Sequence, residues 1–336
     1  MVAAVLLASF LPQLGRSGGW LHLDQVGDVG IFLIFFLHGM GLSPASLMHG
    51  ASRWKLHLLV QVCTFAAFPL WWWALDAAFG RWIPPDLRLG FFYLAVLPST
   101  VSSSVAMTAL ARGNVAAAVL NATLSTLLGV VLTPLLASLL LHTGPQGHPA
   151  NLIDTMLKVA RMLLLPFVVG QLLRPWIGTW FAKHKPWTNK VDRGVILLLV
   201  LCSFSDSVAD GLWRDHGVGM LALTFVGVAL FLFPMLWFTR QVARWMGMPI
   251  EDEIVAMFCG SKKTLASGVP MARLLFGGNP ALGILVLPIM FYHQLQLFTC
   301  SVLARRLAAR DDGGAKTVAS AAGPAPTPAP APATGR

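Results

Sequence analysis

The chain has 336 residues, of which 56% are hydrophobic and only 11% are charged, and its mean hydropathy is +0.70. Because soluble domains carry about 25% charged residues, this composition excludes a soluble protein. The formal net charge of +10 does not indicate nucleic acid binding, since the aromatic residues lie in apolar runs rather than among the basic ones. In a membrane protein such an excess is typical of basic cytoplasmic loops.

Apolar runs of about 18 or more residues recur along the chain, and each can cross a hydrocarbon core of roughly 30 Å. We therefore predict an all-α polytopic membrane protein with about ten spans. The spans are expected at residues 2–14, 25–42, 55–79, 87–111, 114–142, 152–179, 190–212, 217–243, 252–273 and 279–306.

The first run, "MVAAVLLASFLPQLG", is not preceded by a basic segment. A cleaved signal peptide begins with such a segment, so we interpret this run as the first helix. Because the run is short for a complete span, a truncated start stays open.

The basic residues indicate the topology. Loops after the even-numbered spans hold more lysine and arginine than loops after the odd-numbered spans, with Arg53, Lys55 and Lys190 among them. The positive-inside rule then places the even loops and both termini in the cytoplasm. We expect a multi-pass protein of the plasma membrane, which in a bacterium is the inner membrane.

The predicted loop "KHKPWTNKVDR" divides the chain near its middle, with five spans on either side. An odd number of spans per half inserts the second half upside down, as in transporters built from inverted repeats. Residues 1–180 would hold the first repeat and the first span of the second, and residues 181–308 the remainder. Residues 309–336 are rich in proline and alanine and are predicted to form a disordered cytoplasmic tail.

Spans 4 and 9 occupy equivalent places in the two halves, and both are interrupted. Span 4 contains "LPSTVSSSVAMTALARGN" and span 9 contains "CGSKKTLASGVPMARLLFGGN". Each has a polar, proline-containing segment near its middle and ends in Gly-Asn. A chance match of two ordinary turns is the alternative. We expect breaks near Ser99–Ser104 and Ser261–Pro270, and we expect the two broken helices to cross near the bilayer midplane.

Two adjacent lysines lie in the span 9 interruption. From Glu253 to Lys262 is nine residues, or roughly 14 Å of helix, so Lys262 and Lys263 are expected at membrane depth. A charged lysine facing lipid there costs a few kcal/mol, so it must face a cavity, pair with an anion or lose its proton. The alternative is a shorter span whose lysines reach back to the interface.

Other polar residues in the apolar spans complete a set of candidates. The hydroxyls of spans 4 and 5 can line a small-cation site, although membrane hydroxyls most often bond to their own helix. His293 can relay a proton or serve as a packing residue, and Gln61 carries the same ambiguity. Asp206 can be a cation ligand or a counter-charge for a lysine. The candidate substrate- or ion-binding residues are Ser102, Ser103, Ser104, Asn121, Thr123, Ser125, Ser261, Lys262, Lys263, Thr264, His293, Gln294 and Gln61.

The stretches "LPSTVSSSVAMTALARGNVAAAVLNATLSTLLGVVLTPLL" and "CGSKKTLASGVPM" carry a family resemblance. The chain resembles the bile acid:sodium symporter superfamily, solute carrier family 10, in its divergent "member seven"-like branch. The resemblance implies two inverted five-helix repeats with broken, crossing spans 4 and 9. It also implies a core of spans 3–5 and 8–10, a panel of spans 1, 2, 6 and 7, and substrate bound between them during alternating access.

The chain departs from the family where sodium is expected to bind. The resemblance places the sodium-binding carboxylate near Met257, and its Gln-Asn pair near Ser261 and Lys262, so sodium coupling is in doubt. A fixed lysine ammonium can replace the ion. We expect no cofactor, and the sequence leaves sodium and proton coupling open.

These observations favour a secondary transporter of an organic anion that is sodium-independent and is not specific for bile acids. The alternative is a non-transporting, regulatory membrane protein that affects calcium homeostasis, which the resemblance to the "member seven"-like branch keeps open. An enzyme is not expected, because the chain has no HExxH motif. The expected partners are a small organic anion and the lipid bilayer.

Overall fold

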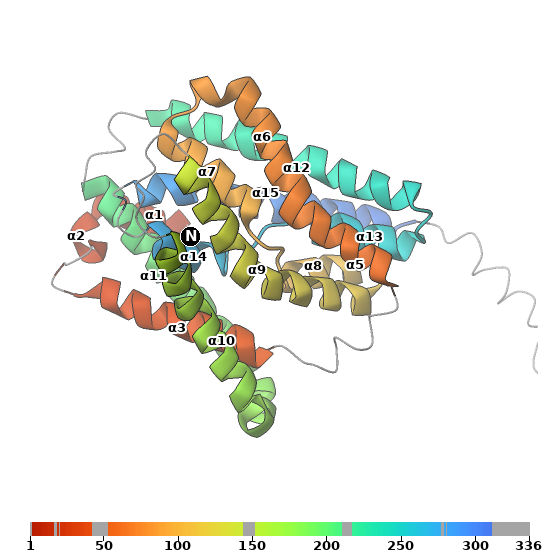
Figure 1. Cartoon of the computed structure of the whole chain (residues 1–336), viewed down its shortest axis with the longest axis horizontal. Coiled ribbons are helices and arrows are strands. Elements are labelled where there is room, and N and C mark those ends of the chain that lie inside the picture. The colour runs from red at the N-terminus through yellow and green to blue at the C-terminus, as the bar shows by residue number, and fades with distance from the viewer. Residues whose placement is uncertain are drawn as a thin grey trace, which may run out of the picture.

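The computed structural model describes residues 2–16, 19, 21–41, 53–143, 152–209, 217–276, 279 and 281–310. Within these ranges every regular element is a helix, and the helices pack into one bundle (Figure 1). In chain order they are α1 (Val2–Phe10), α2 (Pro12–Gly15), α3 (Leu23–Gly41), α5 (Trp54–Val62), the π-helix η2 (Cys63–Ala67), α6 (Phe68–Phe79), the 3₁₀-helix η3 (Gly80–Trp82), α7 (Pro85–Val96), α8 (Ser102–Leu110), α9 (Val115–Thr143), α10 (Leu152–Lys183), α11 (Lys185–Ala209), α12 (Gly217–Trp245), α13 (Ile250–Gly260), α14 (Gly268–Phe276) and α15 (Leu282–Ala308).

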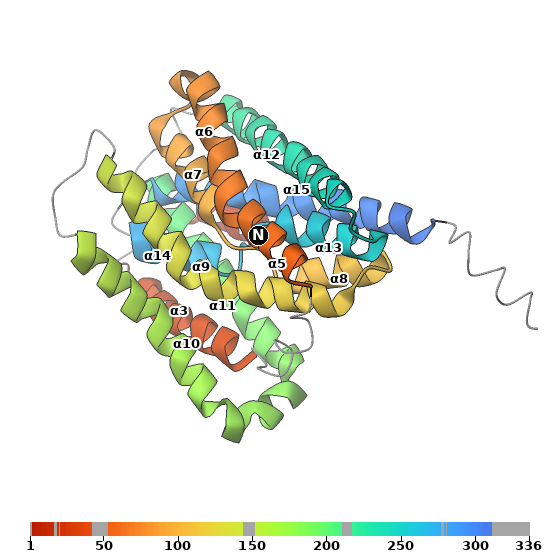
Figure 2. The ribbon, with the colours of Figure 1, turned by 45° about the vertical axis from the view of Figure 1, so that its right-hand side comes forward.

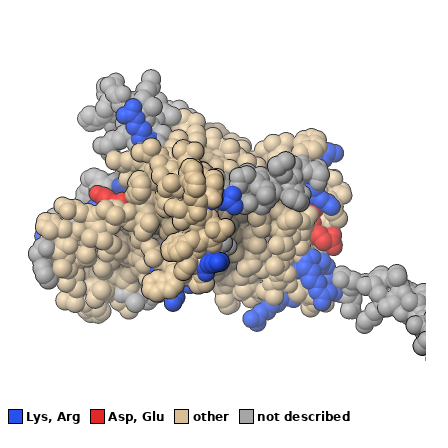
Figure 3. All heavy atoms as spheres, turned by 90° about the horizontal axis from the view of Figure 1, so that it is seen from below, with Lys and Arg blue, Asp and Glu red and all other residues tan. Residues whose placement is uncertain are grey.

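The prediction of an all-helical, multi-pass membrane protein is confirmed. In the described part of the chain, five helical stretches are long and apolar enough to cross a bilayer: Trp54–Trp82, Val115–Ser138, Arg161–Phe181, Gly217–Trp245 and Leu282–Ala308. On the face shown in Figure 3, uncharged side chains cover most of the surface, and lysine and arginine gather most densely at the right-hand end.

Helix contacts divide the bundle into two groups. The panel group consists of α1, α2, α3, α10 and α11, whose main contacts are with one another. The core group consists of α5 to α9 with α12 to α15. Figures 1 and 2 both place α3 and α10 on one side of the bundle and α6 and α12 on the other.

Glycines bring the panel helices α3 and α10 into close contact. A Cβ atom on Gly39 would lie 2.2 Å from the carbonyl oxygen of Phe167, and one on Gly170 would lie 2.3 Å from that of Phe36. Small residues allow helix backbones to approach closely in membranes, where van der Waals packing drives association. These two positions therefore set the α3–α10 contact.

The core group contains the two expected helix interruptions. The first separates α7 from α8 over residues 97–101, and the second separates α13 from α14 over residues 261–267. The expected breaks were placed slightly too far along the chain, because Ser102–Ser104 already form the first turn of α8 and Gly268–Pro270 the first turn of α14. The two interruptions contact each other directly, since the amide nitrogen of Thr264 donates to the carbonyl oxygen of Pro98 at 2.9 Å.

The predicted central loop at residues 183–193 is wrong. Helix α10 continues to Lys183 and α11 begins at Lys185, so a single turn residue, His184, separates them. The basic side chains made this segment look like a loop, but lysine and arginine are good helix formers, and Pro186 lies in the first turn of α11, where proline is tolerated. Of the predicted tail 309–336, residues 311–336 lie outside the described residues.

Candidate functional site

The break after α7 leaves four successive carbonyl oxygens without helical partners, and other segments supply donors to all of them. The side-chain nitrogen of Lys263 donates to the carbonyls of Ala95 and Leu97. The Thr133 hydroxyl donates to the carbonyl of Val96, and the Thr264 amide donates to the carbonyl of Pro98. Buried backbone groups need partners, so the break is stable only because α9 and the second interruption provide them.

The Lys263 side chain reaches from the second interruption into the first. Its Nζ atom donates to the carbonyl oxygens of Thr64, Ala95 and Leu97 at 2.8, 2.8 and 2.7 Å. The ring of Phe68 lies against it, with 4.0 Å between Nζ and the ring centroid. The whole residue is inaccessible to solvent.

These contacts determine which form of the amine fits. Three carbonyl oxygens can each accept a hydrogen bond but cannot donate one. The ammonium form of lysine has three N–H donors, whereas a neutral amine has two. The geometry therefore matches the ammonium form, and the ring of Phe68 adds a favourable contact with a cation.

A local feature of the third expected span frees the Thr64 carbonyl. Thr64 lies in η2, where the amide of Phe68 bonds the carbonyl of Cys63 rather than that of Thr64. The next residue, Pro69, has no N–H. A single-turn π-bulge of this kind often marks a functional position, and here it supplies one ligand of the Lys263 ammonium.

Side chains of α15 and α7 hold the second interruption in place. Gln296 accepts from the amide of Lys263 and donates to its carbonyl, both at 2.9 Å. Two tyrosine hydroxyls donate to the carbonyls at either end of the break, Tyr292 to Ser261 and Tyr93 to Gly268. Lys263 is thus positioned by its backbone as well as by its ammonium group.

Lys262 points in a different direction from Lys263. Its Nζ atom donates to the carbonyl oxygen of Ser103 at 2.9 Å and lies 5.4 Å from the centroid of the Phe258 ring. The Ser103 side chain is half-buried, and the neighbouring Ser102 is exposed. Lys262 therefore lies just beneath the partly exposed face of α8.

The structure brings together part of the predicted set. Ser103, Ser104, Ser261, Lys262, Lys263 and Thr264 lie at the junction of the two interruptions, where the Ser104 hydroxyl donates to the carbonyl of Phe258. Ser125 joins them, because its hydroxyl accepts from the amide of Ser99. Each of these residues supports the break or binds a neighbouring carbonyl.

Other predicted residues lie further from this junction or differ in role. Asn121 accepts from Gln61 through its carbonyl at 3.2 Å, which forms a separate buried pair between α9 and α5. Thr123 is buried, Ser102 and Gln294 are exposed, and His293 contacts Gln296 at 3.1 Å. Met257 is buried, and the described residues hold no cluster of three or more His, Cys, Asp or Glu side chains suited to a metal ion.

The structure gives Asp206, expected as a cation ligand or a counter-charge for a lysine, an arginine partner. Asp206 on α11 lies 3.7 Å from the guanidinium of Arg273 on α14. Asp206 belongs to the panel group and Arg273 to the core group, so this ion pair connects the two. A second connection lies nearby in sequence, where the amide of Gly283 donates to the hydroxyl of Ser207 at 3.0 Å.

Thr64, Phe68, Pro69, Gln296, Tyr93 and Tyr292 contribute to the site but are absent from the predicted set. A signal existed for the tyrosines, because the chain has only two of them beside 20 phenylalanines. Where Phe is so strongly preferred, a hydroxyl at a core position indicates a hydrogen bond that is needed. Pro69 also offered a signal, since a proline within a span frees a carbonyl one turn before it.

Comparisons with known proteins match almost the whole chain to membrane transporters. The model of the SBF-like CPA transporter family matches residues 1–309. An uncharacterized protein of Pseudomonas aeruginosa is 49% identical over 323 residues, which cover 96% of this chain and 95% of that protein. The putative symporter YfeH of Escherichia coli K12 is 42% identical, and the match covers 91% of this chain and 90% of that protein. Sodium/bile acid cotransporter 7 of Rattus norvegicus is 30% identical, and the match covers 90% of this chain and 89% of that protein.

Proposed function

The chain belongs to the SBF-like CPA transporter family, and on that premise we propose that it is a secondary transporter of an organic anion that works without sodium. As a family member it is a membrane transporter and not an enzyme. The proposal adds the class of substrate and the absence of sodium coupling. Relatives are named as symporters or as sodium/bile acid cotransporters, but the residues around Lys263 support a different coupling here.

The observation that carries the proposal is the position of the Lys263 ammonium group. Three backbone carbonyl oxygens converge on its Nζ atom within 2.8 Å. Carbonyl oxygens freed by broken helices are the ligands that bind sodium in transporters of this kind. Because the ammonium already takes these oxygens, it supplies the charge of a coupling cation permanently, and sodium has no role at this position.

Anion selectivity follows from the remaining charge. Lys262 makes one hydrogen bond to a carbonyl, so its ammonium has further donors for a substrate carboxylate or sulfonate. The N-termini of α8 and α14 start at the two interruptions and add the positive ends of two helix dipoles. No acidic side chain of the predicted site offsets these charges.

The transport cycle would use the two helix groups described above. We infer that the two halves of the chain form inverted repeats, and that the panel group moves against the core group, with both termini in the cytoplasm. Substrate would bind between the panel and core groups, at the partly exposed face of α8. The Asp206–Arg273 and Ser207–Gly283 contacts would hold one side of this boundary closed.

Uptake into proteoliposomes tests the proposal. A thermal-stabilisation screen of small carboxylates, sulfonates and a bile acid first identifies an anion that binds the purified chain. Uptake of that anion is then measured with sodium replaced by potassium or choline. We expect equal uptake in all three salts, loss of uptake in Lys263→Met, and full uptake in the control Lys55→Met, whose lysine is exposed.

Two results would contradict the proposal. Uptake that requires sodium would show that Lys263 is not a substitute for the ion. The absence of uptake for every stabilising anion, together with altered cellular calcium on deletion, would favour the regulatory alternative.

A further inference from the structure

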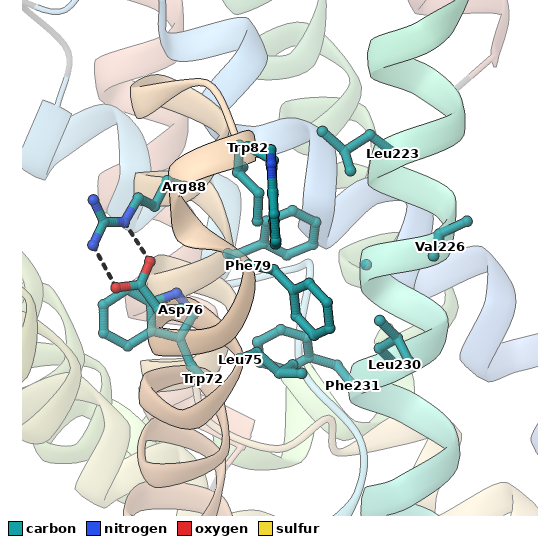
Figure 4. A pocket seen from close by; sticks show the side chains of 13 residues that line it. Trp72, Leu75, Asp76, Phe79, Trp82, Arg88, Leu223, Val226, Leu230 and Phe231 are labelled. Atoms are coloured by element: carbon teal, nitrogen blue, oxygen red, sulfur yellow. Dashed lines mark hydrogen bonds and ion pairs between the residues drawn. The ribbon is translucent and has the colours of Figure 1, made fainter.

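A cavity of ≈ 270 Å³ lies between α6, η3, α7 and α12 (Figure 4). Aromatic rings of Trp72, Phe79 and Trp82 line one side, and Leu223 and Leu230 of α12 line the other. The cavity is slightly smaller than the ~300–1,000 Å³ of sites that enclose a whole drug-sized ligand. It has room for one apolar chain or ring.

The cavity lies on the side of the core group that is turned away from the panel helices α3 and α10. Helices α6 and α12 form the side of the bundle opposite α3 and α10 in both ribbon views (Figures 1 and 2). Val226, Leu230 and Trp82 at the cavity are 55%, 42% and 58% exposed. In a chain that spans a bilayer, exposed apolar side chains of this size face lipid, so the cavity is reached from the hydrocarbon region.

One end of the cavity is charged. Arg88 donates through Nε and Nη2 to the two carboxylate oxygens of Asp76 (Figure 4). The Arg88 side chain is 49% exposed, and among the described residues its Nη1 atom makes no further hydrogen bond. Nearby, the guanidinium of Arg81 stacks on the ring of Trp82 at 4.1 Å.

Arginine and tryptophan together are typical of the interface between hydrocarbon and headgroups, where their polar tips reach the phosphate level. The cavity therefore has its apolar part at hydrocarbon depth and its charged end at headgroup depth. The two arginines at this end are balanced by Asp76 and by Asp86 in the first turn of α7, so the local charge is close to zero.

We propose that this cavity binds one acyl chain of a zwitterionic phospholipid, whose phosphate accepts hydrogen bonds from Arg88. A soluble substrate is a poor fit, because apart from the Arg88–Asp76 pair the lining is apolar or aromatic. Phosphate suits the free edge of a guanidinium that is already fixed by a carboxylate. The balanced charge favours a headgroup that also carries an amine.

Native mass spectrometry of the full chain in detergent tests the proposal, with dioleoyl phosphatidylethanolamine as the probe and dioleoyl phosphatidylglycerol as the comparison. Val226→Trp fills the cavity. The matched control is Val218→Trp on the same helix, where the side chain is 81% exposed and does not line the cavity. The double variant Asp76→Asn, Arg88→Gln removes both charges, so that neither is left unpaired.

We expect the first bound molecule of phosphatidylethanolamine to bind about tenfold more weakly to Val226→Trp, because the tryptophan excludes part of one acyl chain. Its binding to Val218→Trp should be unchanged. The double variant should also weaken binding and should abolish any preference between the two lipids.

Equal binding by all variants, or equal loss in Val218→Trp, would overturn the proposal. Tighter binding of phosphatidylglycerol to the wild type would overturn the headgroup assignment. If the wild type were a dimer and Val226→Trp a monomer, this face would bind a second copy of the chain rather than lipid.

Discussion

At the scale of single residues, the Lys263 ammonium makes the contacts that a small bound cation would make. Its charge is stabilised by the dipoles of three carbonyls and by the face of one aromatic ring. Substitution by a small residue would leave these oxygens converging on an empty space. The same oxygens could then coordinate a metal cation of the right size.

We therefore predict that Lys263→Ala becomes sensitive to sodium. The variant should be less stable than the wild type, because each unsatisfied buried carbonyl costs about 1–3 kcal/mol. Sodium at about ten times its dissociation constant should restore about 1.4 kcal/mol, whereas choline should restore none. Thermal unfolding of the purified variant in sodium chloride and in choline chloride measures this, and the wild type should be indifferent to the salt. Identical curves for Lys263→Ala in both salts would show that the carbonyls do not form a cation site.

Gln296 has a separate, structural role at the same interruption. Because it satisfies both the amide and the carbonyl of Lys263, Gln296→Leu should destabilise the chain by about 2–6 kcal/mol, or about 1–3 for each buried group. Gln294→Leu is the control, since that side chain is exposed two residues away. Unfolding temperatures of both variants test this, and a Gln296→Leu variant as stable as the control would mean that the break does not depend on this side chain.

Some of the site could be predicted from the sequence because its residues are unusual for their surroundings. Two lysines and a run of serines inside apolar spans are costly unless they are used, and Lys262, Lys263, Ser103 and Ser104 do lie at the junction. Gln296 could not be distinguished from Gln294 in the same way, because the side of α15 that faces the interruption depends on tertiary packing.

At the scale of elements, the acidic N-terminus of α13 pairs with basic residues of neighbouring segments. Its first turn holds Glu251, Asp252 and Glu253, which also suit the positive end of a helix dipole. Asp252 pairs with Arg53 before α5, and Glu253 pairs with Arg244 at the end of α12. These pairs fix the end of the broken span to the continuous helices around it.

Within this cluster, we predict that Asp252 matters more than Glu251. Asp252 is buried and also accepts from the side chain of Asn114 at 3.0 Å, so Asp252→Asn should cost about 1.5–3 kcal/mol, as expected for hydrogen bonds to a charged group. Glu251 is half-exposed and lies 3.7 Å from Arg310, and an exposed pair contributes about 0–1 kcal/mol. Denaturation of the two variants should show this order, and a larger loss in Glu251→Gln would contradict it.

Elements were easier to predict than the boundaries between them. Continuous apolar runs predict spans because the bilayer sets their length, and the helices follow those runs closely. The basic segment at residues 183–193 was misassigned, because polarity indicates solvent contact but does not distinguish a helix from a loop. The π-bulge at Cys63–Ala67 has a local signal in Pro69, but the pairing of the freed Thr64 carbonyl with Lys263 depends on tertiary packing, which no local pattern contains.

At the scale of the whole molecule, the panel and core groups contact each other through α10, which packs against α9, and through α11. Helix α11 packs against α14 and α15, and Gly283 allows the approach, because a Cβ atom there would lie 2.5 Å from the Ser207 hydroxyl. The Asp206–Arg273 ion pair joins α11 to α14, the helix that follows the second interruption. If the panel group moves against the core group during transport, these contacts must separate once in every cycle.

We therefore predict that locking α11 to α14 stops transport without unfolding the protein. The variant Asp206→Cys, Arg273→Cys places two thiols on the facing positions, while the four natural cysteines are buried. A bifunctional methanethiosulfonate reagent should abolish uptake of the identified anion in this double variant, and a reductant should restore it. Either single variant treated in the same way should retain its uptake, because a single thiol cannot bridge the groups. The thermal stability of the cross-linked protein should be equal to or above that of the untreated variant, which separates locking from damage. Full uptake by a fully cross-linked protein would show that α11 and α14 stay together throughout the cycle, and that the moving boundary lies elsewhere in the bundle.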